Sequence, residues 1–243
     1  TWSGTNIETW LSAEFISTIE GQEWVAKNLE KREAYVKTFH DGSWKQILQD
    51  WIEANSFENA FGVEREEKLD ARYHFSSWST TALITPFETL IDKEFDGHVC
   101  FMRSFELSEE LIKNATKATL HLGQIDDDEK TIVNGKIVGE TKGWRQQRNY
   151  TIDKPAEVFV EGLNIIAICA TDSGGGGGFH DVVADDICLK LYNGSKVVTI
   201  PLAEKEWSYK ASKVDYKNRP PDFDNVSPYS YSACYYGMMS PLI

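Results

Sequence analysis

The chain has 243 residues, of which 41% are hydrophobic and 26% are charged, and its formal net charge is −13. This length suffices for one large domain, or for a domain with a smaller helical unit. The acidic surplus argues against a nucleic acid partner, which needs clustered Lys and Arg. No apolar run is long enough to cross a bilayer, so we expect no membrane span.

The first third of the chain has helical periodicity. Apolar residues recur at spacings of three and four over 44–52, which predicts an amphipathic helix. Ser43 and Gln46 form a candidate capping box at its start. A second amphipathic pattern covers 22–39, and a weaker helical pattern covers 64–71. We expect the two stronger helices to pack their aromatic stripes on each other or on a sheet.

From about Ser76 the pattern changes to short strands. Apolar runs predict strands at 99–105, 118–122, 130–133, 136–138, 149–152, 164–171, 187–191 and 197–201. Asn134-Gly135 and Asn193-Gly194 each separate two of them. Asn-Gly favours a β-hairpin because both turn residues must accept positive φ. Many short strands without intervening helices predict a β-sandwich.

The cysteines Cys100, Cys169 and Cys188 lie in apolar, strand-like runs, and Cys234 lies near the C-terminus. A free cysteine behaves as a small buried hydrophobe, and this is the favoured interpretation for the first three. There is no C-x-x-C spacing, which argues against a zinc knuckle or a redox pair. Disulfides are the alternative, and their pairing is not readable from the sequence.

Six segments between 95 and 172 carry a family resemblance. They are 95–103, 105–107, 118–126, 133–139, 148–152 and 162–167. In this order and spacing they resemble the galactose-binding-like, sugar-binding-type jelly roll of glycoside hydrolase family 2. The resemblance implies a mainly β fold, a jelly-roll β-sandwich with an N-terminal α-helical segment.

The two ends of the chain carry a second resemblance. Residues 2–10 resemble the "GGTPIEAW" segment of sialate O-acetylesterase-like enzymes, and 232–243 resemble their "YNGMI-PL" segment. The run 172–178 is similar to the "DTGGGGG" of inserts in those enzymes. The resemblance implies an insert that carries short pieces of its host hydrolase core, in a periplasmic or secreted protein.

The host enzymes resemble SGNH hydrolases, whose nucleophilic Ser lies in a "GQSN" segment and whose His lies in a late Asp-x-x-His segment. Neither segment occurs in this chain. By resemblance, the backbone N–H of Gly4 is a candidate oxyanion donor in the full-length parent, although Ser3 replaces the first glycine of that block. None of the five histidines lies in a G-x-S-x-G or similar motif. One donor without a nucleophile or base gives no covalent catalysis, so we expect the chain to be inactive alone.

Four consecutive acids at 126–129 precede a predicted strand. The favoured interpretation is a solvated turn whose carboxylates accept backbone N–H bonds. The alternative is that Asp126 contacts a metal or a sugar hydroxyl. The spacing does not match a calcium loop, and we expect no metal and no cofactor.

The glycine run 174–178 lacks the Lys-Ser/Thr of a phosphate-binding loop. Five glycines cost conformational entropy to order, which predicts either a mobile connection or a backbone packed tightly against something. In the second case Phe179 and His180 would be loop-tip side chains able to reach a ligand.

Residues 142–150 have the composition of a sugar site. Trp144 offers an aromatic platform, and Arg145 or Arg148 could hold a carboxylated sugar, because Arg meets carboxylate with two parallel hydrogen bonds. The alternative is that Trp144 and Tyr150 close one end of the core while Arg148 is solvated. Both interpretations stay open at this point.

We expect three regions: a host-enzyme stub with a helical segment at 1–75, the sandwich at 76–212, and a connector with a return stub at 213–243. By resemblance, the expected function is a non-catalytic accessory region of a carbohydrate O-acetylesterase, which supports binding of an acetylated sugar or glycan beside the host core. The alternatives are an independent carbohydrate-binding module and a structural or oligomerisation spacer.

Overall fold

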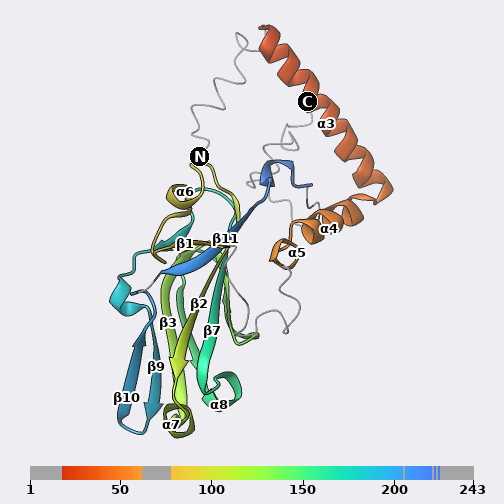
Figure 1. The fold of residues 1–243 in the computed structure, drawn as a ribbon. Coiled ribbons are helices and arrows are strands. Elements are labelled where there is room, and N and C mark those ends of the chain that lie inside the picture. The colour runs from red at the N-terminus through yellow and green to blue at the C-terminus, as the bar shows by residue number, and fades with distance from the viewer. Residues whose placement is uncertain (1–17, 62–77, 205, 221, 223, 225–243) are drawn as a thin grey trace. The chain divides into compact units, whose positions relative to one another are not determined.

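A computed structural model describes residues 18–61, 78–204, 206–220, 222 and 224 (Figure 1). The chain divides into two compact units, one formed by Thr1–Asn55 with Lys217–Ile243 and the other by Ser56–Tyr216. The predictions for 64–71, for the two end segments, and for Gly4 and Cys234 lie outside the described residues.

The first unit contains the two predicted amphipathic helices. Helix α3 spans Ile19–Asp41, and helix α4 spans Trp44–Ala54. The hydroxyl of Thr18 accepts a hydrogen bond from the Gly21 N–H at 2.9 Å, which caps the start of α3. Helix α3 ends at Gly42, whose φ of 75° is the left-handed conformation that glycine adopts without strain.

The predicted capping box at the start of α4 is not formed. Ser43 is the N-cap residue, but its side chain makes no cap hydrogen bond. Its backbone N–H instead donates to Asp41 Oδ1 at 2.9 Å. The Gln46 amide donates to Asp50 Oδ1 at 2.7 Å, one turn further along the helix. The start of the helix is therefore predicted correctly and its cap is not.

The apolar stripe of α4 is only partly buried. Trp44 and Leu48 are buried, whereas Ile47 and Ile52 are 41% and 40% exposed. Most apolar side chains of α3 lie outside the described part of the chain. The predicted packing of the two stripes therefore stays a prediction.

The second unit is a β-sandwich of two antiparallel sheets, which confirms the predicted fold class (Figure 1). In order across the first sheet lie β1 (Ser79–Thr81), β11 (Trp207–Lys213), β2 (Gly97–Leu107), β7 (Gly162–Asp172), β4 (Asp128–Val133) and β5 (Lys136–Thr141). The second sheet contains β10 (Lys196–Pro201), β9 (Cys188–Asn193), β3 (Lys117–Asp126) and β6 (Gln147–Ile152), and β8 (Gly178–His180) pairs with β3.

Short helices accompany the strands. They are α5 (Phe57–Phe61), α6 (Phe87–Leu90), α7 (Glu109–Asn114), α8 (Pro155–Val158), η3 (Ala184–Asp186) and η4 (Tyr216–Asn218). Helix α6 lies at one end of the sandwich and α7 at the other (Figure 1). No helix in the described ranges is long and apolar enough to span a bilayer.

Two predicted hairpins are present, and they use different turns. The β4–β5 turn contains Asn134 (φ 49°) and Gly135 (φ 80°), the two positive φ values of a type I′ turn. The β9–β10 turn is formed by Gly194 (φ 58°) and Ser195. It lies one residue later than the predicted pair that starts at Asn193, because glycine at the first central position suits a type II′ turn.

Strand β2, which the sequence predicted as a strand over 99–105, is buried on both faces for most of its length. Val99 and Phe101 lie in the main core between the sheets. Cys100 and Met102 point the other way and join a second apolar cluster, against which Phe61 and Trp78 pack. Because a strand alternates its side chains, burial of both sets requires cover on the outer face of the sheet.

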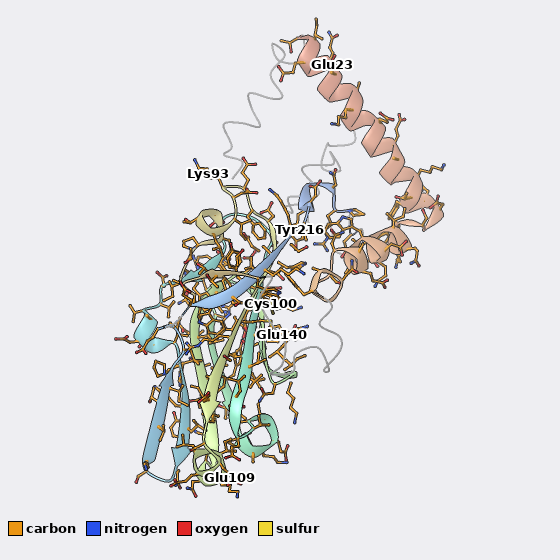
Figure 2. All side chains as sticks on the ribbon, in the orientation of Figure 1. Glu23, Lys93, Cys100, Glu109, Glu140 and Tyr216 are labelled. Carbon is orange, nitrogen blue, oxygen red and sulfur yellow. A yellow bond between two sulfur atoms is a disulfide. The ribbon has the colours of Figure 1, made fainter. Side chains whose placement is uncertain are left out.

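A disulfide joins two adjacent strands. Cys100 on β2 and Cys169 on β7 are register partners, and their sulfur atoms are bonded (Figure 2). The favoured prediction of free thiols is therefore wrong for these two residues and correct for Cys188, which is free and buried. The pairing depends on the register of strands 69 residues apart, and no local pattern encodes it.

Candidate functional site at one end of the sandwich

The predicted site residues meet at the α6 end of the sandwich. Strand β3 runs from α7 toward α6 and ends at Asp126, where β4 begins (Figure 1). Strand β6 starts at this end, β7 finishes here, and the glycine run leads from β7 into β8. Antiparallel pairing thus brings three loops, far apart in sequence, to one edge of both sheets.

Exposed Trp144 and Arg145 and partly buried His180 form a surface cluster, which we call the platform. Trp144 is 43% exposed. The Arg145 guanidinium carbon lies 4.1 Å from the Trp144 ring centroid, and the His180 ring centroid lies 5.8 Å from it. His180 Nε2 donates to the Trp144 carbonyl oxygen at 2.9 Å. An exposed Trp144 does not close the core, so that part of the alternative interpretation is wrong.

Asp128 holds the loop that carries Trp144. Its Oδ1 accepts a hydrogen bond from the Gly143 N–H at 2.8 Å. Gly143 has a φ of 85°, so the turn that presents Trp144 needs a residue without a Cβ. Neither residue was predicted to shape the site, although a glycine directly before Trp144 was a usable signal of a turn.

Arg148 lies under the platform and is fully buried. Its Nη2 donates to the Asp127 carbonyl at 2.7 Å, its Nη1 donates to the Gln146 carbonyl, and its Nε lies 3.9 Å from Glu129 Oε2. Burial lowers the pKa of the guanidinium. The prediction of a solvated side chain is wrong, because Arg148 is buried and its donors bond the loops above it. Its contact with a ligand stays a prediction.

Glu129 and Tyr150 close the side of the sandwich between β5 and β6. The buried Glu129 carboxylate accepts hydrogen bonds from the hydroxyls of Tyr150 and Thr131. Burial raises the pKa of Glu129 to about 7. A Cβ on Gly139 would lie 2.2 Å from the Tyr150 ring, so the ring packs directly on the β5 backbone. Tyr150 therefore has the closing role that one interpretation gave it.

The acidic turn is not a solvated one. Asp126 and Asp127 are partly buried, and burial with the neighbouring Asp127 raises the pKa of Asp126 to about 7. The prediction that acids of this turn accept backbone N–H bonds is correct for Asp127 and Asp128. Asp127 Oδ2 accepts from the Ser173 N–H at 3.1 Å and from its hydroxyl at 2.8 Å.

The glycine run is packed at its end and open in its middle. Glu88 Oε1 accepts from the Gly177 N–H at 2.9 Å. A Cβ on Gly177 would lie 2.4 Å from the Phe87 ring and 2.6 Å from Asp172 Oδ2, whereas one on Gly176 would meet nothing within 4 Å. Of the two predicted alternatives, tight packing applies to the residues next to β8.

Two further side chains border this run. Phe179 lies in the main core and is 4% exposed, so it is not a loop-tip side chain. It follows the β8 alternation, which turns Phe179 inward and His180 outward. Asp172 is fully buried, and burial raises its pKa to about 6. Its Oδ1 accepts from the Gly174 N–H at 3.0 Å, and its Oδ2 has no hydrogen-bond partner among the described residues.

The described histidines make structural contacts. His98 Nδ1 lies 2.8 Å from the Thr171 hydroxyl, and His121 Nδ1 lies 2.9 Å from Asn149 Oδ1. His180 bonds the Trp144 carbonyl, as described above. Within the part of the chain that the structure describes, no group of three His, Cys, Asp or Glu side chains is placed to hold a metal ion.

Comparisons with known proteins find partial likeness to solved structures. No protein-family model and no curated protein matches the chain. Among solved structures it is similar to a β-D-mannosidase from Dictyoglomus thermophilum, with 20% identity, a TM-score of 0.29, and coverage of 35% of this chain and 10% of that one. It is also similar to a Streptomyces avermitilis α-L-rhamnosidase complexed with L-rhamnose, with 25% identity, a TM-score of 0.33, and coverage of 53% and 12%.

A third similar structure is the Pleurotus ostreatus lectin, with 21% identity, a TM-score of 0.31, and coverage of 52% of this chain and 32% of that one. The chain thus spans between 10% and 32% of the lengths of these three proteins. The class that the strand order itself defines is an antiparallel β-sandwich domain of the jelly-roll type.

Proposed function

We propose that the sandwich is a non-catalytic carbohydrate-binding domain whose ligand contacts the platform. The observation that carries this proposal is the exposure of Trp144 beside Arg145 and His180. A sugar ring presents C–H groups to an aromatic surface and hydroxyls to planar polar groups. The platform combines these two kinds of contact on adjacent loops.

The platform is also held in place before any ligand arrives. The Trp144 backbone is bound by His180, and the preceding Gly143 is bound by Asp128. Side chains fixed in advance lose less conformational entropy on binding, so more of the contact energy appears as affinity. This supports a binding role over that of a passive spacer.

Binding of glycans by the full chain tests the proposal. We expect titration calorimetry on array hits to show at least about tenfold weaker binding after Trp144→Ala. Phe39→Ala is the matched control, because Phe39 is an exposed aromatic residue (51%) on α3, outside the sandwich. Circular dichroism would verify that both variants fold. Unchanged affinity in Trp144→Ala, or an array without hits, contradicts the proposal.

The sequence resemblances support a parent enzyme of the carbohydrate O-acetylesterase type, in which the sandwich would be an accessory region beside the substrate cleft. In this proposal the nucleophile and base belong to the host core. The chain alone should hydrolyse an acetylated sugar no faster than background. Turnover that a single Ser→Ala substitution abolishes would contradict a non-catalytic role.

The disulfide supports the periplasmic or secreted location that the resemblance implies. Disulfides persist in oxidising compartments and are rare in the cytosol. Alkylation of the denatured protein followed by intact-mass analysis should show Cys100 and Cys169 unmodified unless a reductant is added. Both thiols modified in protein isolated from its native compartment would argue against this location.

A further inference from the structure

The segment 142–148, which carries the platform Trp, is locally basic in an acidic protein. The whole chain has 38 acidic and 25 basic residues, yet this segment contains Lys142, Arg145 and Arg148 and no acid. Arg148 is buried, and its donors are directed at the carbonyls of Gln146 and Asp127. Two exposed cations, Lys142 and Arg145, are therefore left at the surface.

Several surface cations in the described ranges pair with acids, whereas Lys142, Arg145 and some others, such as Lys196, do not. Lys113, Lys154 and Lys213 each pair with an acid on the protein surface. Among the described residues, neither Lys142 nor Arg145 forms such an ion pair. The Arg145 guanidinium instead stacks on the Trp144 ring, which leaves its edge free to donate two parallel hydrogen bonds.

We infer that the ligand of the platform is a glycan with a carboxylated sugar, such as a uronic acid, whose carboxylate binds the Arg145 guanidinium. This inference rests on the proposed carbohydrate-binding function and names its ligand class. The planar fork of Arg matches the two carboxylate oxygens, and stacking on Trp144 fixes the fork in advance. Lys142 adds a second positive charge on the same loop.

Two acids, Asp128 and Asp181, border the platform, and their charges affect how an anionic ligand would bind. Asp128 already accepts a hydrogen bond from Gly143. The Asp181 side chain is 82% exposed, and its Oδ2 lies 3.5 Å from His180 Nδ1. An anionic ligand would be repelled by Asp181, so its neutralisation should strengthen binding of a carboxylated sugar. A neutral sugar should respond little to the same change.

The experiment uses the full chain and matched glycan pairs. The probes are oligosaccharides of galacturonic acid, glucuronic acid and sialic acid, each compared with its methyl ester, which keeps the sugar and removes the charge. We expect at least one acid to bind at least about tenfold more tightly than its ester. Arg145→Gln should abolish that preference, Asp181→Asn should increase it, and added salt should weaken it.

Lys196→Gln is the matched control. Lys196 is exposed in the β9–β10 hairpin, and strand β9 pairs there with the Lys117 end of β3, away from Asp126. Its removal should leave the preference for the acid unchanged, and circular dichroism would verify the fold of each variant.

Three outcomes would overturn the inference in distinguishable ways. Equal binding of acids and esters, or hits confined to neutral glycans, refutes the carboxylate while the carbohydrate-binding proposal stands. Binding of sulfated neutral sugars as tightly as of uronic acids shows charge attraction without carboxylate recognition. Absence of binding to every acidic, esterified and neutral probe refutes both proposals together.

Discussion

The Asp128 carboxylate accepts a hydrogen bond from the backbone N–H of Gly143 at 2.8 Å, and so joins the start of β4 to the loop that carries Trp144. The two residues are 15 positions apart in the sequence: Asp128 begins β4, and Gly143 follows the end of β5. Asp128, at the start of β4 in the first sheet, thereby holds the turn at Gly143 that positions Trp144 at the surface.

Removal of this carboxylate should loosen the loop without unfolding the domain. For Asp128→Ala we expect faster amide exchange at 142–147 and an affinity several-fold lower for any platform ligand, because the loop must then be ordered on binding. Asp153→Ala is the control, since Asp153 is also exposed but lies at the far end of β6. Identical exchange in both variants would show that the hydrogen bond does not order the loop.

Arg145 and Arg148 should respond to substitution in opposite ways. Arg148→Ala leaves the buried Glu129 without its cationic neighbour and two loop carbonyls without donors, so it should destabilise the fold by about 3–5 kcal/mol. Arg145→Ala removes an exposed side chain and should change stability by less than about 0.5 kcal/mol. Chemical denaturation of both variants measures this. Similar losses would contradict the placement of the two guanidinium groups.

Stability should depend on pH through three carboxyl groups whose pKa values are raised in the fold. The pKa is about 7 for Asp126, about 7 for Glu129 and about 6 for Asp172, in each case mainly because of burial. As pH rises from about 4 to 7, the unfolded chain releases these protons first, so the folded state binds more protons and loses stability. This contribution should level off above the folded pKa values. Urea denaturation across this range measures the slope.

Asp172→Asn isolates one of the three groups. The amide keeps the acceptor that Gly174 uses and cannot ionise. The variant should be more stable than the parent chain by about 1–3 kcal/mol near pH 8, and the difference should shrink toward zero near pH 4. A difference that stays constant over this range would show that the Asp172 carboxyl does not titrate in the fold.

The glycine run should tolerate substitution unevenly. Gly177→Ala places a methyl group 2.4 Å from Phe87 and 2.6 Å from Asp172, so it should destabilise the domain by about 1–3 kcal/mol. Gly176→Ala meets no atom within 4 Å and should be neutral or slightly stabilising, because alanine restricts the unfolded chain. Thermal denaturation of both variants decides the matter. Equal effects would mean that the run has no packed end.

Most of the sandwich is predictable because its strands carry local signals. Continuous apolar runs mark β2 and β7, and an Asn-Gly pair marks the β4–β5 turn. Strands β1 and β11 were missed, since Ser79–Thr81 is short and Trp207–Lys213 has few apolar residues. Their formation depends on pairing with β2 and with each other, which is non-local.

The residue types of the site were predictable from the sequence, but the burial of each side chain was not. From the sequence we predicted ligand contacts that include Trp144, Arg145 and His180, and in the structure these three side chains lie together. It could not separate exposed Arg145 from buried Arg148, because both lie in one polar segment. Which of them faces solvent depends on where β6 begins under the neighbouring loops.

The covalent link between Cys100 and Cys169 also determines how this domain would carry tension. A force applied to the flanking chain would pass from one sulfur to the other and bypass the segment between the two cysteines, which are 69 positions apart. If this segment were fully extended, the pulled chain would lengthen by about 230–250 Å, and the intact disulfide prevents that extension. A pulled domain would therefore keep β3–β6 inside a closed ring, together with Trp144 and Arg145.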